Sequence, residues 1–263
     1  MSTVFVTLCD AAYFEKAKQT IQDIRGVGKW LGDIVLIPVG FLPSAEDCAQ
    51  YNLRTHTFPR IPTSELIAHY KAHPLSTPTH DRREFTKVTQ WEKLHLFDTF
   101  FQTWERVVYV DAGLRILDDV ESFLCLDWKG KFLAPDDTWN DANKRFRCQL
   151  ELVNSPSALQ SLVSTYGEGI LEETYFLNCM WIYDTALLSN PLKPIMLEVM
   201  NRFPLWRTNE MGVMNIVLHF QHRVWTPFPL VANNGKYLFD WCERNRSSTH
   251  WSQYCALKYP VTL

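Results

Sequence analysis

The first 40 residues alternate between strand and helix patterns, and this alternation limits most strongly how the chain can fold. The β-branched apolar run Val4–Leu8 is too short for a helix and predicts a buried strand. Apolar residues then recur at helical spacing from Phe14 to Arg25, and Asp33–Ile37 predicts a second strand that ends at Pro38. A strand, a helix and a strand in so short a span predict a βαβ unit with parallel strands and a right-handed crossover.

The same alternation continues along the chain. Further helices are expected over Ser44–Ala49, Phe85–Phe101 and Glu210–Phe220, and further strands over His56–Phe58, Val107–Val110, Phe132–Ala134 and Phe176–Tyr183. Residues 73–83 predict a loop, and an irregular region is expected after about residue 230. The predicted fold class is α/β, with a mostly parallel central sheet flanked by helices. No linker or repeat interrupts the pattern, so we expect a single domain over residues 1–263.

Composition excludes several classes of protein. A hydrophobic share of 46% with 21% charged residues is typical of a globular chain with a sizeable core. The net charge of −3 and the lack of a basic run argue against a nucleic-acid partner. No apolar run is long enough to predict a membrane span, and the first residues lead into a strand rather than a leader peptide. Seven scattered cysteines without a Cys-x-x-Cys pair favour reduced thiols and a cytoplasmic location.

Carboxylates follow several of the predicted strands. Asp10, Asp111 and the pair Asp136–Asp137 each come directly after an apolar run. Because ligands of open parallel sheets bind at the carboxyl ends of the strands, these side chains are expected along one rim. Asp111 is followed by Ala112 and Gly113, which also suit an ordinary turn, so a simple turn residue is the alternative interpretation of Asp111.

The order of several motifs resembles that of one enzyme family. Lys93–His95 lies on the helix before the apolar strand that ends in Asp111–Gly113, and Leu117–Phe123 and Ala134–Asp141 follow. This order resembles the glycogenin-like (family 8) glycosyltransferases with the GT-A fold, in which Lys-Leu-His precedes Asp-x-Asp, an L…DVD.LF segment and Ala-Pro-Asp-x-x-Trp-x-Asp. Weaker similarities to the same family lie at Val6–Leu8 with Tyr13, at Tyr175–Tyr183, at Glu210–Asn215 and at His250–Pro260.

The resemblance implies a role for each of these positions. Asp111 and His250 would bind Mn²⁺ or Mg²⁺, a Lewis acid for the departing diphosphate of the donor. Lys93 and Lys258 would neutralise phosphate charge, and Glu210 and Asp136 would be the catalytic carboxylates. The residues that would bind the nucleotide-sugar donor are Thr7, Leu8, Tyr13, Lys93, Asp111, Ala112, Gly113, Asp137, Asn178 and Lys258.

Some positions depart from the family pattern. Gly113 replaces the second Asp of Asp-x-Asp and removes one carboxylate ligand. Cys179 and Met180 stand where the family has Ser-Gly, and Met211 replaces a Gln. These changes indicate a divergent branch with its own sugar or a catalytically weakened member.

The expected reaction follows from the resemblance. The chain is expected to transfer a hexose from a UDP-sugar donor to a hydroxyl acceptor on a glycan or protein. The anomeric configuration is expected to be retained. The alternative is a weakened nucleotide-sugar-binding protein of the same fold. A sugar-1-phosphate nucleotidyltransferase is disfavoured because Cys9–Tyr13 is not a Gly-rich loop. Trp139 is the best candidate for a ring that stacks on a sugar, and self-association into a homodimer stays open.

Overall fold

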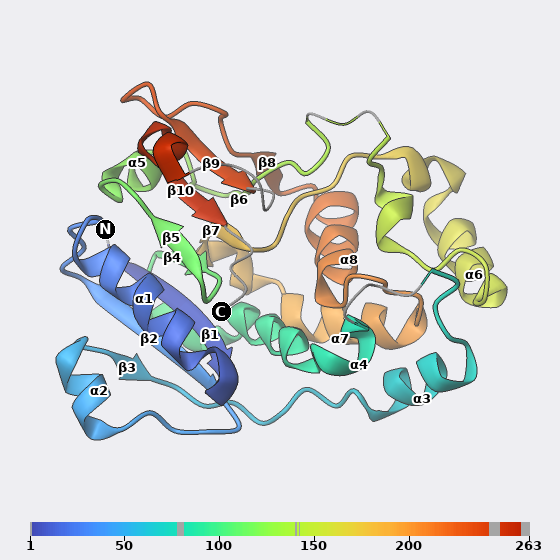
Figure 1. Ribbon diagram of the computed structural model, residues 1–263. Helices are drawn as coiled ribbons and strands as arrows, with labels where there is room; N and C mark the ends of the chain where they lie inside the picture. Colours follow the sequence, from blue (N-terminus) through green and yellow to red (C-terminus); the bar gives the residue numbers. More distant parts are fainter. Residues whose placement is uncertain (1, 78–81, 140, 142, 242–247, 259–263) are drawn as a thin grey trace.

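The computed structural model describes residues 2–77, 82–139, 141, 143–241 and 248–258, with the side chains of Arg83 and of residues 248–250 left out (Figure 1). The described residues form a seven-stranded sheet in the order β3-β2-β1-β4-β7-β6-β8. Its strands are β1 (Thr3–Asp10), β2 (Asp33–Val39), β3 (Arg54–Thr55), β4 (Arg106–Val110), β6 (Phe132–Ala134), β7 (Met180–Asp184) and β8 (Trp225–Pro227). Only β7 runs antiparallel to its neighbours, so the expected mostly parallel sheet is confirmed.

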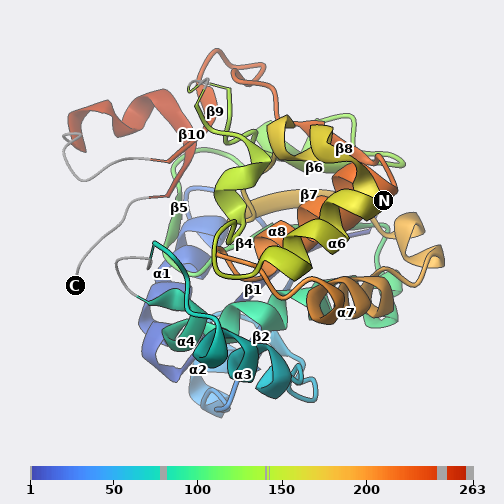
Figure 2. The ribbon, with the colours of Figure 1, turned by 90° about the vertical axis from the view of Figure 1, so that its right-hand side faces the viewer.

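Helices cover both faces of this sheet (Figures 1 and 2). They are α1 (Phe14–Arg25), α2 (Ala45–Gln50), α3 (Ser64–Ala72), α4 (Arg83–Thr86), α5 (Glu121–Leu124), α6 (Pro156–Tyr166), α7 (Leu192–Arg202) and α8 (Glu210–Met214). Short 3-10 helices are η1 (Ala11–Tyr13), η2 (Val88–Phe97), η3 (Thr99–Thr103), η4 (Phe146–Gln149), η5 (Glu168–Glu172), η6 (Thr185–Ser189) and η8 (Ser248–Gln253), and η7 (Asn215–Gln221) is a π-helix. Among the described residues no helix combines the length and apolar character that crossing a membrane requires.

Successive side chains of the strands point to opposite faces and form two core clusters. On one face, Phe5 and Val108 pack with Ile21 of α1. On the other face, Val6 and Tyr109 pack with the apolar side chains of η2, α7 and α8. The sheet is therefore buried on both faces, as its continuous apolar strands indicate.

The predicted βαβ unit is present, but the strand ends differ from expectation. β2 continues through Pro38 to Val39, although the proline was expected to end it. β3 pairs only with Val35 and Leu36, so the later part of β2 forms an edge in the described structure, where a residue without an N–H is tolerated. The strand expected over His56–Phe58 is wrong as well. β3 ends at Thr55, and the His56 ring stacks on Phe100 with centroids 3.8 Å apart.

The long helix expected over Phe85–Phe101 is also wrong. The segment divides into α4, η2 and η3, with breaks at Lys87 and Asp98. Asp98 has an extended backbone with φ −80° and ψ 150°, and its carboxylate accepts the Phe100 amide at 3.0 Å. A side-chain cap at this position stabilises the start of a new helix over continuation of the previous one.

The C-terminal region is more regular than expected. A second, three-stranded sheet has the order β5-β10-β9, with β5 (Leu114–Ile116), β9 (Tyr237–Trp241) and β10 (Tyr254–Lys258) (Figure 1). The expectation of irregular structure after residue 230 is therefore wrong, because β10 pairs antiparallel with β5 and buries Ala256 and Leu257. The pairing places Lys258 opposite Leu114, next to the turn that follows β4.

The helix expected over Glu210–Phe220 is confirmed in extent, although its second half is wound as the π-helix η7.

The strand expected from Phe176 starts only at Met180. The Asn215 side chain accounts for the difference, since its Oδ1 accepts the Phe176 amide at 3.0 Å and its Nδ2 donates to the Phe176 carbonyl at 3.2 Å. A side-chain amide thus takes the hydrogen bonds that a neighbouring strand would otherwise make.

Candidate active site

The order of the strands reverses at β1. The chain runs outward from β1 through β2 to β3 and then returns to place β4 on the other side of β1. Ligands of open α/β sheets bind beyond the carboxyl ends of the strands at such a reversal. Asp10 ends β1 and Asp111 follows β4, so both lie at the reversal.

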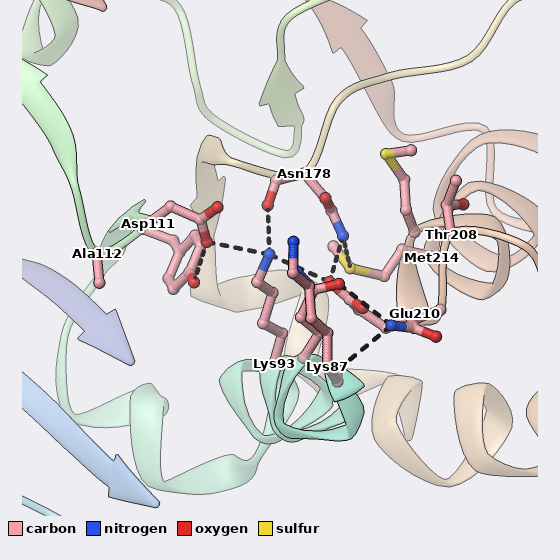
Figure 3. A network of polar contacts seen from close by, with 12 residues as sticks. Lys87, Lys93, Asp111, Ala112, Asn178, Thr208, Glu210 and Met214 are labelled. Atoms are coloured by element: carbon pink, nitrogen blue, oxygen red, sulfur yellow. Dashed lines mark hydrogen bonds and ion pairs between the residues drawn. The ribbon is translucent and has the colours of Figure 1, made fainter. Parts of the chain in front are cut away.

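Lys93 is the centre of a polar network at this place (Figure 3). Its Nζ lies 3.0 Å from Asp111 Oδ1 and 3.1 Å from Glu210 Oε1, and it donates to the carbonyl oxygen of Asn178 at 3.2 Å. The residue is only 4% exposed because every side chain of η2 from Trp91 to Phe97 is buried. A buried ammonium is stable only when charged partners surround it. Burial alone lowers the pKa of Lys93, but Asp111 and Glu210 outweigh burial and raise it.

Two aromatic rings form the apolar side of the network. Tyr109 and Trp181 stack with ring centroids 4.0 Å apart across the pairing of β4 with β7. The Lys93 Nζ lies 5.6 Å from the Tyr109 centroid and 6.0 Å from the Trp181 centroid. Both distances suit a cation–π contact, which fixes the position of the ammonium.

Both carboxylate oxygens of Asp111 are engaged. Besides its contact with Lys93, Oδ1 accepts the Tyr109 hydroxyl at 2.6 Å, and Oδ2 lies 3.4 Å from Lys258 Nζ. Lys258 also donates to the Ala112 carbonyl at 3.0 Å. Burial raises the pKa of Asp111, but the two lysines and the Tyr109 hydroxyl lower it by more, so the carboxyl is ionised.

Glu210 lies behind Lys93 and is 1% exposed. Its Oε1 accepts the Asn178 side-chain amide at 2.6 Å, while Oε2 has no hydrogen-bond partner among the described residues. Burial raises the pKa of Glu210, and the attraction of Lys93 reverses only part of that rise. The carboxylate therefore holds Lys93 and Asn178 in place and is shielded from the solvent.

Asp136 and Asp137 follow β6 and have different partners. Asp136 Oδ1 accepts both the amide and the hydroxyl of Thr138 at 2.7 Å. Asp137 lies 2.9 Å from Lys144 Nζ and accepts the Tyr175 hydroxyl at 2.7 Å. These contacts fix the direction of both carboxylates.

A pocket of about 580 Å³ joins these groups. Its size is within the usual range for small-ligand sites. The predicted residues that line it are Lys93, Asp111, Asp136, Asp137 and Asn178. Trp139 and Trp241, which are 56% and 45% exposed, lie at the same pocket.

Other predicted residues lie outside the pocket lining. Thr7 and Leu8 are buried within β1, and Tyr13 is an exposed residue at the end of η1. Ala112 contributes its carbonyl to Lys258, as described above. The side chain of the predicted metal ligand His250 lies outside the described residues.

Gly113 forms a turn with φ +84°. Its amide donates to Thr20 Oγ1 at 3.0 Å, and a Cβ atom at this position would lie 3.4 Å from the Lys16 side chain. A positive φ favours glycine over residues with a Cβ atom. Asp111–Gly113 is thus a tight turn as well as part of the polar network.

Several residues of the site had no sequence signal. Tyr109 and Trp181 look like ordinary core residues in apolar strands, and Trp241 precedes a region without a clear pattern.

The cysteines at the site are buried. Burial, followed by the charge of the neighbouring aspartate, raises the pKa of Cys179 and of Cys9 to about 12.

The metal ligands implied by the family resemblance are only partly present in the described residues. These residues contain no group of three or more His, Cys, Asp or Glu side chains that could hold a metal ion. Asp111, the predicted ligand that is described, has an ammonium group at each carboxylate oxygen. The described donor set therefore does not fit a divalent ion.

Comparison with known proteins identifies the fold. No known family profile matches the sequence, and no curated protein matches it. Among solved structures, the bifunctional glycosyltransferase WbbM superposes with a TM-score of 0.62 and 14% identity, over 99% of this chain and 46% of that one. The galactosyltransferase LgtC, solved with donor and acceptor sugar analogs, gives 0.62 and 10%, over 98% of this chain and 87% of LgtC.

A third similar structure is the Mn/GDP form of core-mannan synthase A from Aspergillus fumigatus. It has a TM-score of 0.52 and 8% identity, over 87% of this chain and 73% of that one. The chain spans a little under half of WbbM. With its seven-stranded central sheet flanked by helices, the chain has the GT-A glycosyltransferase fold.

Proposed function

We propose that the chain is a glycosyltransferase that transfers a hexose from a UDP-sugar to a hydroxyl acceptor. The observation that carries the proposal is the network of Lys93, Asp111 and Glu210 at the strand reversal of a GT-A fold. This network opens into a pocket that also contains Asp136 and Asp137. Lysines beside carboxylates that point into a pocket suit a ligand with both phosphate and sugar hydroxyl groups.

Each of these residues has its own role in the transfer step. The bond between the anomeric carbon and the donor phosphate breaks, its electron pair leaves with the diphosphate, and the acceptor oxygen bonds to the anomeric carbon. The acceptor attacks the face that the diphosphate leaves, its proton passes to a phosphate oxygen, and the anomeric configuration is retained. Lys258 stabilises the charge on the departing diphosphate, and Asp136 stabilises the positive charge that develops on the sugar ring. Asp137 and Asn178 bind sugar hydroxyls.

Glu210 acts as a positioning residue in this scheme. Because it is 1% exposed and bonded to both Lys93 and Asn178, it influences the reaction through them. Glu210→Gln is expected to reduce kcat more than it raises KM for the donor, since a misplaced Asn178 affects the bound sugar more than the nucleotide.

Two tryptophans support a carbohydrate acceptor. Trp139 and Trp241 line the same pocket and keep about half of their surface exposed. Indole rings pack well against the C–H faces of sugars and donate a hydrogen bond from their N–H. We therefore favour a glycan over a protein side chain as the acceptor.

A panel of UDP- and GDP-sugars tests the proposed function. Binding is measured by isothermal titration calorimetry, and hydrolysis or transfer to saccharides is measured by product analysis. A UDP-hexose is expected to bind and turn over, and Asp136→Asn to reduce turnover at least tenfold. The exposed ion-pair residue Asp127 supplies the matched control, Asp127→Asn, which leaves turnover unchanged. Failure of every nucleotide sugar to bind would refute the proposal.

A protein that binds nucleotide sugars without transferring them is the second candidate. It is favoured by the replacement of a carboxylate by Gly113 beside Asp111. The same panel separates the two, because this candidate predicts donor binding with no transfer to any acceptor and no hydrolysis.

The thiols support a reducing compartment, and we propose the cytoplasm. The six cysteines within the described residues are all unpaired. A disulfide found by mass spectrometry in the protein isolated without reductant would contradict this location.

A further inference from the structure

We propose that the Lys258 ammonium takes the place of a divalent metal ion in this site, so that binding of the donor diphosphate does not require a metal. The inference rests on the proposed function and concerns how the same site holds the nucleotide. It starts from the mismatch between the described donor set and a metal ion.

The first observation is the position of Lys258. Its Nζ lies 3.4 Å from Asp111 Oδ2 and donates to the Ala112 carbonyl at 3.0 Å. Both oxygens thus contact one and the same cationic group. The ammonium therefore satisfies the two acceptors that a metal ion would otherwise coordinate.

The second observation is the loss of a ligand at Gly113. The residue has no side-chain oxygen, and its φ of +84° disfavours a residue that carries one. The turn is thus built for glycine, and one carboxylate remains where a hard divalent ion needs several oxygen ligands.

The third observation separates the roles of the two lysines. Lys93 has three oxygen partners, on Asp111, Glu210 and Asn178, which use all the hydrogens of an ammonium group. Lys258 uses two of its hydrogens on the described residues, and its side chain is 16% exposed. Lys93 therefore fixes the network, and Lys258 has a hydrogen left for a phosphate oxygen.

Binding of UDP, measured by calorimetry in EDTA and in Mn²⁺, tests the inference. We expect the Kd values in the two conditions to agree within fivefold. Lys258→Met should weaken UDP binding at least tenfold in both conditions, and Lys258→Arg should restore most of the affinity. Lys236→Met is the matched control and should leave the Kd unchanged, because Lys236 forms a similar ion pair with Asp118 and none with Asp111 among the described residues.

Asp111→Asn separates the inference from a metal-binding role of Asp111, because the two predict different changes in UDP affinity. Removing this charge frees Lys258 for phosphate, so the inference predicts unchanged or tighter UDP binding, whereas loss of a metal ligand predicts weaker binding. Fivefold or greater tightening by Mn²⁺ in the wild type, abolished by His250→Ala, would overturn the inference alone. Failure of UDP to bind in either condition would overturn the proposed function and the inference together.

Discussion

Asp111 is held between two ammonium groups, and this contact gives its charge a role in the stability of the fold. Its side chain is 19% exposed, so solvent screens these ion pairs less than pairs on the open surface. Because its pKa in the folded protein lies below the usual 3.8, its stabilising effect is present above that value. The effect is lost as pH falls through the lowered pKa.

Asp111→Asn should therefore destabilise the protein in a pH-dependent way. We expect a loss of about 2 kcal/mol at pH 6.5, because both lysines lose a counterion. The difference from wild type should shrink below pH 3.8, where the unfolded carboxyl is protonated. Urea denaturation at pH 6.5 and at a pH below 3.8 measures the difference in unfolding free energy, with Asp127→Asn as the exposed control. An equal difference at the two pH values would contradict the assignment.

The sequence predicted a helix where η2 lies but did not predict that it is a 3-10 helix. Apolar residues occur at a strict spacing of three from Val88 through Trp91 and Leu94 to Phe97. A 3-10 helix has three residues per turn, so this spacing places them on one face. The same residues fit a 3.6-residue pattern over a short window, and this predicted an α-helix. The spacing of three was the available signal.

The contacts of Asn215 lie at the scale of elements, since they tie the π-helix η7 to the chain before β7. Asn215→Ala removes bonds to the amide and carbonyl of Phe176 and to the carbonyl of Met211. All three residues are buried, so we expect a loss of about 3 kcal/mol of unfolding free energy. The segment also carries Asn178, so donor affinity should fall with stability. Thermal denaturation and titration with a UDP-hexose measure the two effects, and Asn154→Ala on an exposed loop is the control. Unchanged stability would show that the segment before β7 does not need the Asn215 hydrogen bonds to keep its conformation.

At the scale of the molecule, each of the two core clusters combines residues that are far apart in the sequence. The cluster around Phe5 also contains Cys255 and Ala256, and the cluster around Val6 extends to Leu218. We propose on this basis that residues 1–263 form one domain. Differential scanning calorimetry should give a single transition with a calorimetric to van't Hoff enthalpy ratio of about 1. Two resolved transitions would contradict a single domain.

The sequence predicted the parts of the fold that depend on local pattern. The strands β1 and β4, the helix α1 and the mostly parallel sheet follow from runs and spacings of apolar residues. The sheet of β5, β9 and β10 was missed because its strands pair across long stretches of sequence and one is only three residues long. The order of motifs led to the proposed site residues, but the contact of Lys93 with both Asp111 and Glu210 depends on tertiary packing. No local pattern contains that information.

The raised pKa of Cys9 and Cys179 has a practical consequence for labelling. Alkylating reagents react with thiolates, so at neutral pH these two buried thiols are protected chemically as well as sterically. Cys148 is exposed, and its sulfur contacts the carbonyl of Asn143, next to the pocket residue Lys144. A maleimide dye on Cys148 would therefore report on ligands that enter the pocket, in a variant in which the other exposed thiol of the described residues, Cys125, is replaced by serine.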